Sequence, residues 1–178
     1  QFDPLDGDID PAQLTQALAK GARDLGAKII RFCPVMAVEW LGDEWKITTP
    51  NGEIRAEYVV NAAGYRAGEL GKMFGRDVPC VSLAHQYLIT EPIAELTARD
   101  EKLPLIRDPD SSYYLRQEKD GLLLGPYEKN CRAHWLSSDD PMPDDFSFQL
   151  YNDDLERLEW YIEDACARVP ILGTAGIT

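Results

Sequence analysis

The sequence predicts a fold of mixed helices and strands, α/β in the wide sense that includes α+β, and three observations carry this prediction. An amphipathic helix begins at Asp10, a group of short strands joined by turns follows it, and a second amphipathic helix ends before Pro170. Apolar residues at helical spacing predict helices, whereas short runs between turn residues predict strands. A change of composition at residues 75–79 predicts two parts, residues 1–78 and residues 79–178.

The first helix is predicted after Asp10. This residue is a suitable N-cap, Pro11 suits the first helical position, and Gln13 completes a capping box. Gly26 is a typical stop at the C-terminal end. One face carries apolar residues at helical spacing: Leu14, Ala17, Leu18, Gly21, Ala22 and Leu25. The simplest interpretation is an amphipathic helix that packs on a core.

Short strands follow this helix. They are predicted at residues 28–33, 35–40, 45–49 and 54–61. Asn51-Gly52 is a strong hairpin signal, because both positions tolerate a positive φ. The last strand contains Val59-Val60, is predicted to be buried, and ends in Ala62, Ala63 and Gly64. Such small residues let a ligand approach the backbone, but the motif alone favours a tight strand-to-helix turn without a ligand, because small residues are common in turns.

The remaining elements are predicted in the same way. A short helix is expected at residues 67–74, a strand at 81–90, a hairpin of strands 113–118 and 122–127, and a polar surface loop at 130–145. Asp153 and Glu156 are spaced as a capping box for a last helix, which Pro170 stops.

Composition restricts the class of partner. The 178 residues include 18 basic and 31 acidic ones, which gives a net charge of −13. This charge repels nucleic acids and anionic membrane surfaces, so a small substrate is the expected partner. No apolar run approaches the roughly 20 residues that span a bilayer.

The 4 cysteines form no C-x-x-C pair, so we expect no metal site. We also expect reduced thiols, with Cys33 and Cys166 packed.

The order of the motifs along the chain resembles a known family. D-G-x-I-D-P-x-x-L-x-x-A-L-A-x-G-A is followed by P-V, a Trp-containing meander with an N-G turn, and V-V-N-A-A-G. Later matches are H-Q-Y at 85–87, L-P at 103–104, R-D at 107–108, Y-Y-L-R-Q-E at 113–118 and G-L-L-L-G-P-Y-E at 121–128. This set is similar to the central part of FAD-dependent amine oxidoreductases of the D-amino-acid-oxidase type, above all the dimethylglycine and sarcosine dehydrogenase family.

The resemblance implies a fold and an activity. Residues 1–78 would form part of an FAD-binding domain, a partial Rossmann-type layer with a β-meander. Residues 79–178 would form a substrate domain of antiparallel sheet and C-terminal helix. The implied reaction oxidises the C–N bond of a small N-methyl amino acid by hydride transfer to FAD. Another flavin oxidase of the same fold, for glycine or D-amino acids, and a non-catalytic binding module remain as alternatives.

The resemblance also implies roles for single residues. Val35, Ala62, Ala63 and Gly64 match positions beside the dinucleotide. His85 and Tyr114 match catalytic positions, and the implied substrate-binding residues are Tyr87, Arg116 and Tyr127.

Reasoning from the residues leaves alternatives for these positions. By alternation His85 shares a face with Val81, Leu83, Tyr87 and Ile89, and alone it is also compatible with a hydrogen-bonded core histidine. Strand alternation separates Tyr114 from Tyr113, and we favour Tyr114. Arg116 pairs either with a substrate carboxylate or with a carboxylate of the chain. His134 is expected at the surface.

Several expectations concern the protein beyond these residues. Relatives carry a G-x-G-x-x-G turn, an N-terminal histidine bonded to FAD and a later Gly-rich stretch. A central fragment is therefore expected, and alone it should bind no FAD tightly and show no turnover. Tetrahydrofolate is left open, through a domain outside this chain. The expected compartment is the cytoplasm, with the mitochondrial matrix as the alternative, and the electron acceptor and oligomeric state are left open.

Overall fold

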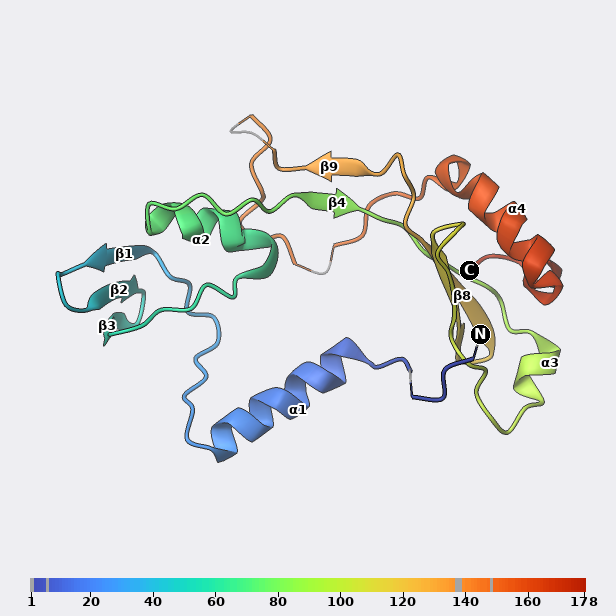
Figure 1. Cartoon of the computed structure of the whole chain (residues 1–178), viewed down its shortest axis with the longest axis horizontal. Coiled ribbons are helices and arrows are strands. Elements are labelled where there is room, and N and C mark those ends of the chain that lie inside the picture. Colours follow the sequence, from blue (N-terminus) through green and yellow to red (C-terminus); the bar gives the residue numbers. More distant parts are fainter. Residues whose placement is uncertain (1, 6, 137–138, 148) are drawn as a thin grey trace. The chain divides into compact units, whose positions relative to one another are not determined.

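The computed structural model describes residues 2–5, 7–136, 139–147 and 149–178. The chain divides into two compact units, Ile9–Ser82 and Leu83–Thr178 together with Gln1–Asp8 (Figure 1). Each unit has its own antiparallel sheet. Among the described residues, no helix is long and apolar enough to cross a membrane.

The first unit contains two α-helices and a three-stranded antiparallel sheet of order β1-β2-β3. Its elements are α1 (Pro11–Asp24), β1 (Ala37–Trp40), β2 (Trp45–Thr49), β3 (Gly52–Ala56), the 3-10 turn η1 (Gly64–Arg66) and α2 (Ala67–Met73). β2 and β3 pair from Trp45↔Ala56 to Thr49↔Gly52, so the predicted Asn51-Gly52 turn is confirmed. Gly52 has φ 119°, a value that glycine adopts at little cost.

Helix α1 begins and ends where the sequence predicts. The Asp10 carboxylate accepts a hydrogen bond from the Gln13 backbone N–H at 2.9 Å, and Gln13 Nε2 reaches back to the Asp10 carboxylate at 3.4 Å. The prediction that its apolar face packs on a core is wrong, because α1 buries no residue and Leu18 is 66% exposed. Local capping therefore fixes the bounds of this helix without any tertiary packing.

Of the strands predicted in this unit, one does not form and another forms only in part. Residues 28–33 are not paired, and the strand predicted at 54–61 ends at Ala56, so that residues 57–63 lie outside any strand. Val60 is 83% exposed, which contradicts the predicted buried strand. A strand needs a neighbour to satisfy its backbone groups, and no described segment pairs with either run.

The second unit is built on a four-stranded antiparallel sheet of order β5-β8-β7-β6. Its elements are β5 (Leu88–Ile89), α3 (Ala94–Thr97), β6 (Ile106–Asp108), β7 (Tyr113–Glu118), β8 (Gly121–Pro126), the 3-10 turn η2 (Leu155–Leu158), α4 (Glu159–Arg168) and the 3-10 turn η3 (Pro170–Thr174). The predicted β7–β8 hairpin is confirmed, with Lys119 at φ 52° in its turn. A separate pair of strands joins β4 (Ser82–Ala84) to β9 (Arg132–His134).

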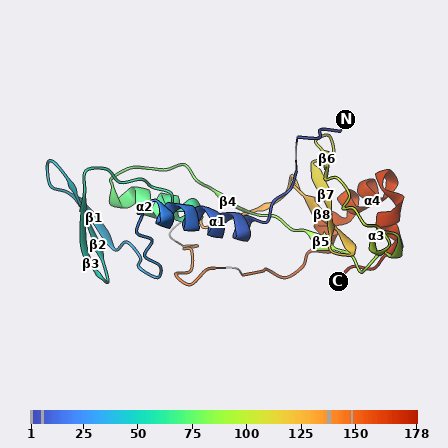
Figure 2. The same cartoon turned by 90° about the horizontal axis from the view of Figure 1, so that it is seen from below.

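Helices α3 and α4 cover one face of the four-stranded sheet, as both views show (Figures 1 and 2). The cluster between them consists of Leu88, Ile93, Leu96, Tyr113, Leu115, Leu122, Leu124, Leu158, Tyr161, Ala165 and Leu172. β8 is buried along its whole length because it lies between β5 and β7 under these helices. This packed layer fixes the backbone on which the candidate site lies.

Three local predictions in this unit need correction. The strand predicted at 81–90 is interrupted, because β4 pairs with β9 and β5 pairs with β8, and residues 85–87 between them belong to neither sheet. β9 lies inside the segment predicted as a loop, of which residues 137–138 are outside the described residues. Asp153 does not cap the last helix, which starts as the 3-10 turn η2 after Asp154 without a side-chain cap.

Candidate active site

The two faces of β7 carry different chemistry. Leu115 and Tyr113 belong to the cluster under α4, whereas Tyr114 and Arg116 alternate onto the opposite face. The pKa of the Tyr113 hydroxyl is raised by burial and by Asp108 and Asp164, which places that hydroxyl beside α4. The choice of Tyr114 over Tyr113 therefore corresponds to a choice of the face turned away from the core.

Gly125 of β8 creates the space that the Tyr114 ring occupies. The two residues are cross-strand partners, and a Cβ on Gly125 would lie 2.2 Å from Cζ of Tyr114 and 2.5 Å from its hydroxyl oxygen. Such distances are far inside van der Waals contact. The ring therefore occupies the place beside β8 that a side chain at position 125 would need, and only glycine at that position leaves this place free.

Tyr127 joins Tyr114 to His85. Its ring centroid is 5.9 Å from that of Tyr114 and 5.6 Å from that of His85, the latter in an edge-on arrangement. Both distances lie in the range of favourable aromatic contacts. Its backbone N–H donates to the Ser112 carbonyl at 2.7 Å, which anchors the residue just after β8 ends. Three predicted site residues thus form a continuous set of rings.

The segment that carries His85 is held by its neighbour Gln86. The Gln86 side chain donates to the Asp154 carbonyl at 3.0 Å and accepts from the Asp154 backbone N–H at 2.8 Å. These two hydrogen bonds hold residues 85–87 in place, as pairing with a neighbouring strand would. It explains how His85 is placed although its segment lies outside both sheets.

His85 makes its hydrogen bond to a residue that sequence reasoning did not single out. Its Nδ1 lies 2.9 Å from Oε2 of Glu128, whose side chain is only 2% exposed. The Arg157 guanidinium is 3.9 Å from the other oxygen of Glu128. One sequence signal was present. Glu128 follows Leu122, Leu124 and Pro126 at a spacing of two residues, and these residues of β8 are buried. A carboxylate on a buried face needs a partner, and that pattern marks it as unusual.

Tyr87 and Arg116 also lie near the Tyr114 hydroxyl. Burial raises the pKa of Tyr114, the phenol groups of Tyr127 and Tyr87 raise it further, and the Arg116 charge lowers it. Arg116 itself pairs with Glu118 at 2.5 Å. The residue predicted to bind a substrate carboxylate therefore already has a carboxylate partner on its own strand.

The predicted cofactor residues belong to the other unit, Ile9–Ser82. Asn61 accepts from the Ala63 backbone N–H at 3.2 Å and donates from its side chain to the Ala67 carbonyl at 2.9 Å. Gly64 has φ 57°, and nothing lies within 4 Å of the position of a Cβ there. Asn61 thus holds a turn whose backbone at residues 62–64 is open to a flat ligand. Val35 is 36% exposed, just before β1.

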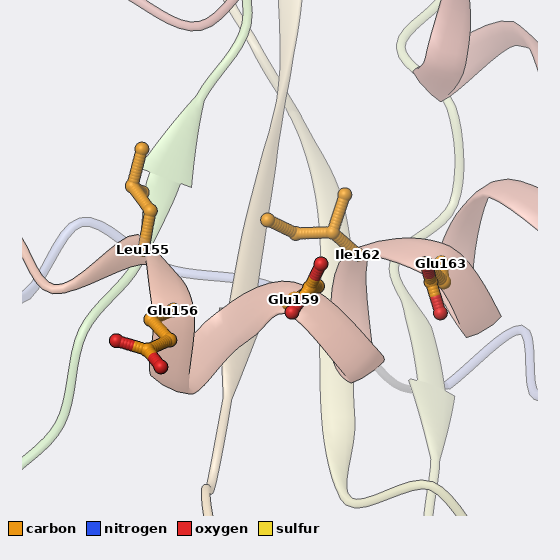
Figure 3. Close-up of a pocket in the computed structure, with 5 residues that line it drawn as sticks. All are labelled: Leu155, Glu156, Glu159, Ile162 and Glu163. Atoms are coloured by element: carbon orange, nitrogen blue, oxygen red, sulfur yellow. The ribbon is translucent and has the colours of Figure 1, made fainter.

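Two surface hollows lie along η2 and α4 in the second unit. One, of about 430 Å³, is lined by Leu155, Glu156, Glu159, Ile162 and Glu163 (Figure 3). The other, of about 350 Å³, is lined by Glu128, Lys129, Asn130, Arg157, Trp160 and Tyr161. None of the predicted site residues lines either hollow. No group of His, Cys, Asp and Glu in the described part of the chain is arranged to hold a metal ion.

The chain is similar to known proteins over nearly all of its residues. Residues 1–178 match the family described as FAD dependent oxidoreductase (DAO). The chain is 43% identical to mitochondrial dimethylglycine dehydrogenase of Mus musculus and 37% identical to mitochondrial sarcosine dehydrogenase of Homo sapiens. These matches cover 99% and 98% of this chain, and 21% and 19% of the relatives, so the chain spans about a fifth of the relatives' length.

The fold has a counterpart among solved structures. L-proline dehydrogenase from P. horikoshii superposes with a TM-score of 0.71 at 24% identity, over 99% of this chain and 43% of that chain. This likeness confirms the mixed fold with antiparallel sheets. The match to the family over all residues shows that the chain belongs to the DAO family of FAD-dependent oxidoreductases.

Proposed function

We propose that the protein oxidises the C–N bond of a small N-methyl amino acid, with FAD as cofactor and His85 and Tyr114 as catalytic residues. The observation that carries this proposal is the set of rings formed by His85, Tyr127 and Tyr114 on the open face of the sheet. The chain is more than a third identical to a dimethylglycine and a sarcosine dehydrogenase, which supports this substrate class.

The open turn at residues 62–64 is suited to hold part of the dinucleotide. A flat group can approach there because Ala62 and Ala63 are small and Gly64 leaves the space beyond its Cα empty. In this proposal Val35, Ala62, Ala63 and Gly64 contact the cofactor through their backbone. When bound, FAD supplies the acceptor for the hydride equivalent that leaves the N-methyl carbon.

The residues of the second unit prepare the substrate for that step. A protonated amine has no lone pair to form the C=N bond, so the amine proton must leave first. His85 accepts this proton, and the Tyr114 hydroxyl donates a hydrogen bond that orients the substrate. Tyr87 and Tyr127 line the substrate's position. Arg116 binds the substrate carboxylate by exchanging its present partner Glu118 for it.

Substrate specificity tests the proposal directly. The experiment uses the longest natural chain that contains residues 1–178, called the parent chain below, and compares its turnover of dimethylglycine, sarcosine and D-alanine. Turnover of an N-methyl substrate supports the proposal. Preference for D-alanine supports instead the alternative of an amino-acid oxidase of the same fold.

Two variants with matched controls test the catalytic residues. His85→Ala and Tyr114→Phe in the parent chain should each lower kcat by on the order of 100-fold, as loss of a positioned proton-transfer group does. The controls are His134→Ala, the second histidine, which stacks on Tyr151, and Tyr113→Phe, on the opposite face of β7. If both test variants match the parent in rate, the non-catalytic alternative is favoured.

For this protein we propose the cellular compartment of its relatives. Both dehydrogenases named above are mitochondrial proteins, so the mitochondrial matrix replaces the cytoplasm as the proposed location. The comparisons give the cytoplasmic prediction no support. Fractionation of cells that express a tagged parent chain tests this location, and recovery in the cytosol alone would contradict it.

A further inference from the structure

We infer that Glu128 is a positioning residue for His85: its buried carboxylate accepts the Nδ1–H hydrogen bond and leaves Nε2 as the proton acceptor of the ring. This inference deepens the proposed function and rests on it for its catalytic consequence. The hydrogen bond itself does not rest on that function, because it is a property of the structure.

The fold holds the two residues in contact. Nδ1 and Oε2 are 2.9 Å apart across 43 residues of sequence, and the Glu128 side chain is 98% buried while that of His85 remains 32% exposed. Within the described part of the chain, this is the only hydrogen bond of the imidazole. The ring therefore has a buried end at Glu128, and its second nitrogen remains available.

The charge around Glu128 decides which nitrogen carries the proton. The Arg157 guanidinium lies 3.9 Å from Oε1, so a positive charge stands next to the carboxylate group. An ionised carboxylate has no proton to donate, so Nδ1 must be the donor in this hydrogen bond. Neutral imidazole has a single N–H, and Nε2 is then left with its lone pair.

Other contacts fix the orientation of the ring. Tyr127 meets it edge-on at 5.6 Å, and Gln86 is bound to the Asp154 backbone on both its donor and acceptor sides. Arg157 also pairs with Asp154, at 2.8 Å, so the same residues that hold the segment of His85 also hold the cation beside Glu128. The carboxylate, the imidazole and the guanidinium are thus parts of one connected network.

The network gives Glu128 a role in the proton transfer. When the substrate ammonium loses its proton, the N–H bond to the substrate nitrogen breaks and an Nε2–H bond forms. The imidazole then carries a positive charge next to the negative charge of Glu128, which stabilises it. Glu128 contacts neither the substrate nor the cofactor in this account, and it acts only through His85.

The protonation of His85 can be measured without turnover. In the ¹⁵N spectrum of histidine-labelled parent chain, the His85 ring is identified by the signals that His85→Gln removes. We expect a protonated Nδ1 and an unprotonated Nε2. Glu128→Leu should abolish this preference and Glu128→Gln, which keeps an acceptor oxygen, should retain part of it. An unprotonated Nδ1 in the parent, or an unchanged spectrum in Glu128→Leu, would overturn the inference.

A double-mutant cycle separates a positioning role from a structural one. Glu128→Leu should lower kcat by on the order of 100-fold with little change in KM, because it disables the positioned base. In the His85→Ala background the same substitution should change kcat by no more than about 3-fold, since the residue through which it acts is gone. Equal effects in the two backgrounds would show that Glu128 serves the fold alone.

Asp108→Asn is the matched control. Asp108 is also a buried carboxylate paired with an arginine, Arg168 at 2.9 Å, but no ring of the site contacts it. Asp108→Asn should lose stability, as is usual when a buried ion pair loses one charge, while keeping kcat. The proposed function and the inference about Glu128 can also be refuted separately. Unchanged rates in both His85→Ala and Tyr114→Phe count against the proposed function, whereas the NMR result on Glu128 refutes or supports the inference alone.

Discussion

The position of the Tyr114 ring depends on the absence of a side chain at Gly125. The ring of Tyr114 lies over the backbone of Gly125, in the place that a methyl group on that residue would take. This arrangement shields the phenol from water and brings it to Tyr127. Glycine weakens a strand by its own conformational freedom, so its presence inside β8, one residue before the strand ends, is a cost that the placement of the ring offsets.

Gly125→Ala should therefore destabilise the protein and disturb the site together. Overpacking of this kind typically costs about 1–3 kcal/mol, and we expect a loss of that size in the free energy of unfolding by urea. Gly21→Ala in α1 is the control, because its Cβ would meet nothing within 4 Å and alanine favours helix. Gly125→Ala as stable as the parent would contradict the described position of the Tyr114 ring.

The raised pKa of Tyr114 predicts a loss of stability at alkaline pH. Burial, the first cause of the shift, makes the folded protein hold the phenolic proton more tightly than the unfolded chain does. Above pH of about 10, where the unfolded tyrosine ionises, unfolding releases protons and stability falls as pH rises. Tyr114→Phe should flatten this decline in urea titrations between pH 8 and 11, and an unchanged decline would speak against a shielded hydroxyl.

At the scale of elements, the second unit is held by the contact of η2 and α4 with the sheet. Leu158, at the end of η2, is fully buried in the cluster, whereas Leu155, one turn earlier, is 46% exposed beside the glutamates of Figure 3. The last helix of the sequence thus begins as a 3-10 turn that inserts one leucine into the core. Packing determines its start, since no side chain caps it.

This difference predicts unequal costs for two similar substitutions. Leu158→Ala should lower the free energy of unfolding by about 2–5 kcal/mol, the usual cost of removing a buried leucine side chain. Leu155→Ala should change it by less than about 0.5 kcal/mol, as exposed substitutions do. Denaturant unfolding of both variants measures the difference, and equal losses would show that η2 is not the element that anchors α4.

The elements that the sequence predicts well are those with local signals. Helix α1 carries its cap and the β7–β8 hairpin carries its turn, so neighbours in sequence decide both. The strands predicted at 28–33 and 54–61 have apolar residues but depend on partners, which the sequence does not reveal. Glu128 was missed for the same reason, because it meets His85 across 43 residues.

The structure brings several of the predicted site residues together. His85, Tyr114 and Tyr127 lie together, as the motif resemblance suggested, and Tyr87 and Arg116 lie close to the Tyr114 hydroxyl. Their catalytic and binding roles stay predictions, as do those of the cofactor residues in the other unit. Strand alternation gave the face of Tyr114 correctly, because β7 is a regular strand with partners on both sides.

Across the whole molecule, the buried apolar residues are unevenly distributed. Ile47 is the one buried hydrophobic side chain described in the unit Ile9–Ser82, and the others lie in the unit that holds the four-stranded sheet. Burial of apolar surface is the main favourable contribution to folding. The two units therefore differ in how strongly their own residues stabilise them.

Hydrogen exchange should report this difference along the chain. In the protein of 178 residues, backbone amides of β7 and β8 should exchange most slowly, because they lie inside the sheet and next to the core. Amides of α1 should exchange fastest among the helices, since that helix buries no residue. Exchange measured by mass spectrometry tests the order, and slow exchange throughout α1 would contradict it.

The ring of Tyr114 lying over Gly125 also has a consequence for evolution. Any descendant in which position 125 gains a side chain must first have replaced the aromatic residue at 114, because the reverse order passes through a clash. The two codons should therefore covary among related genes, and a lineage with alanine at 125 should lack the tyrosine at 114.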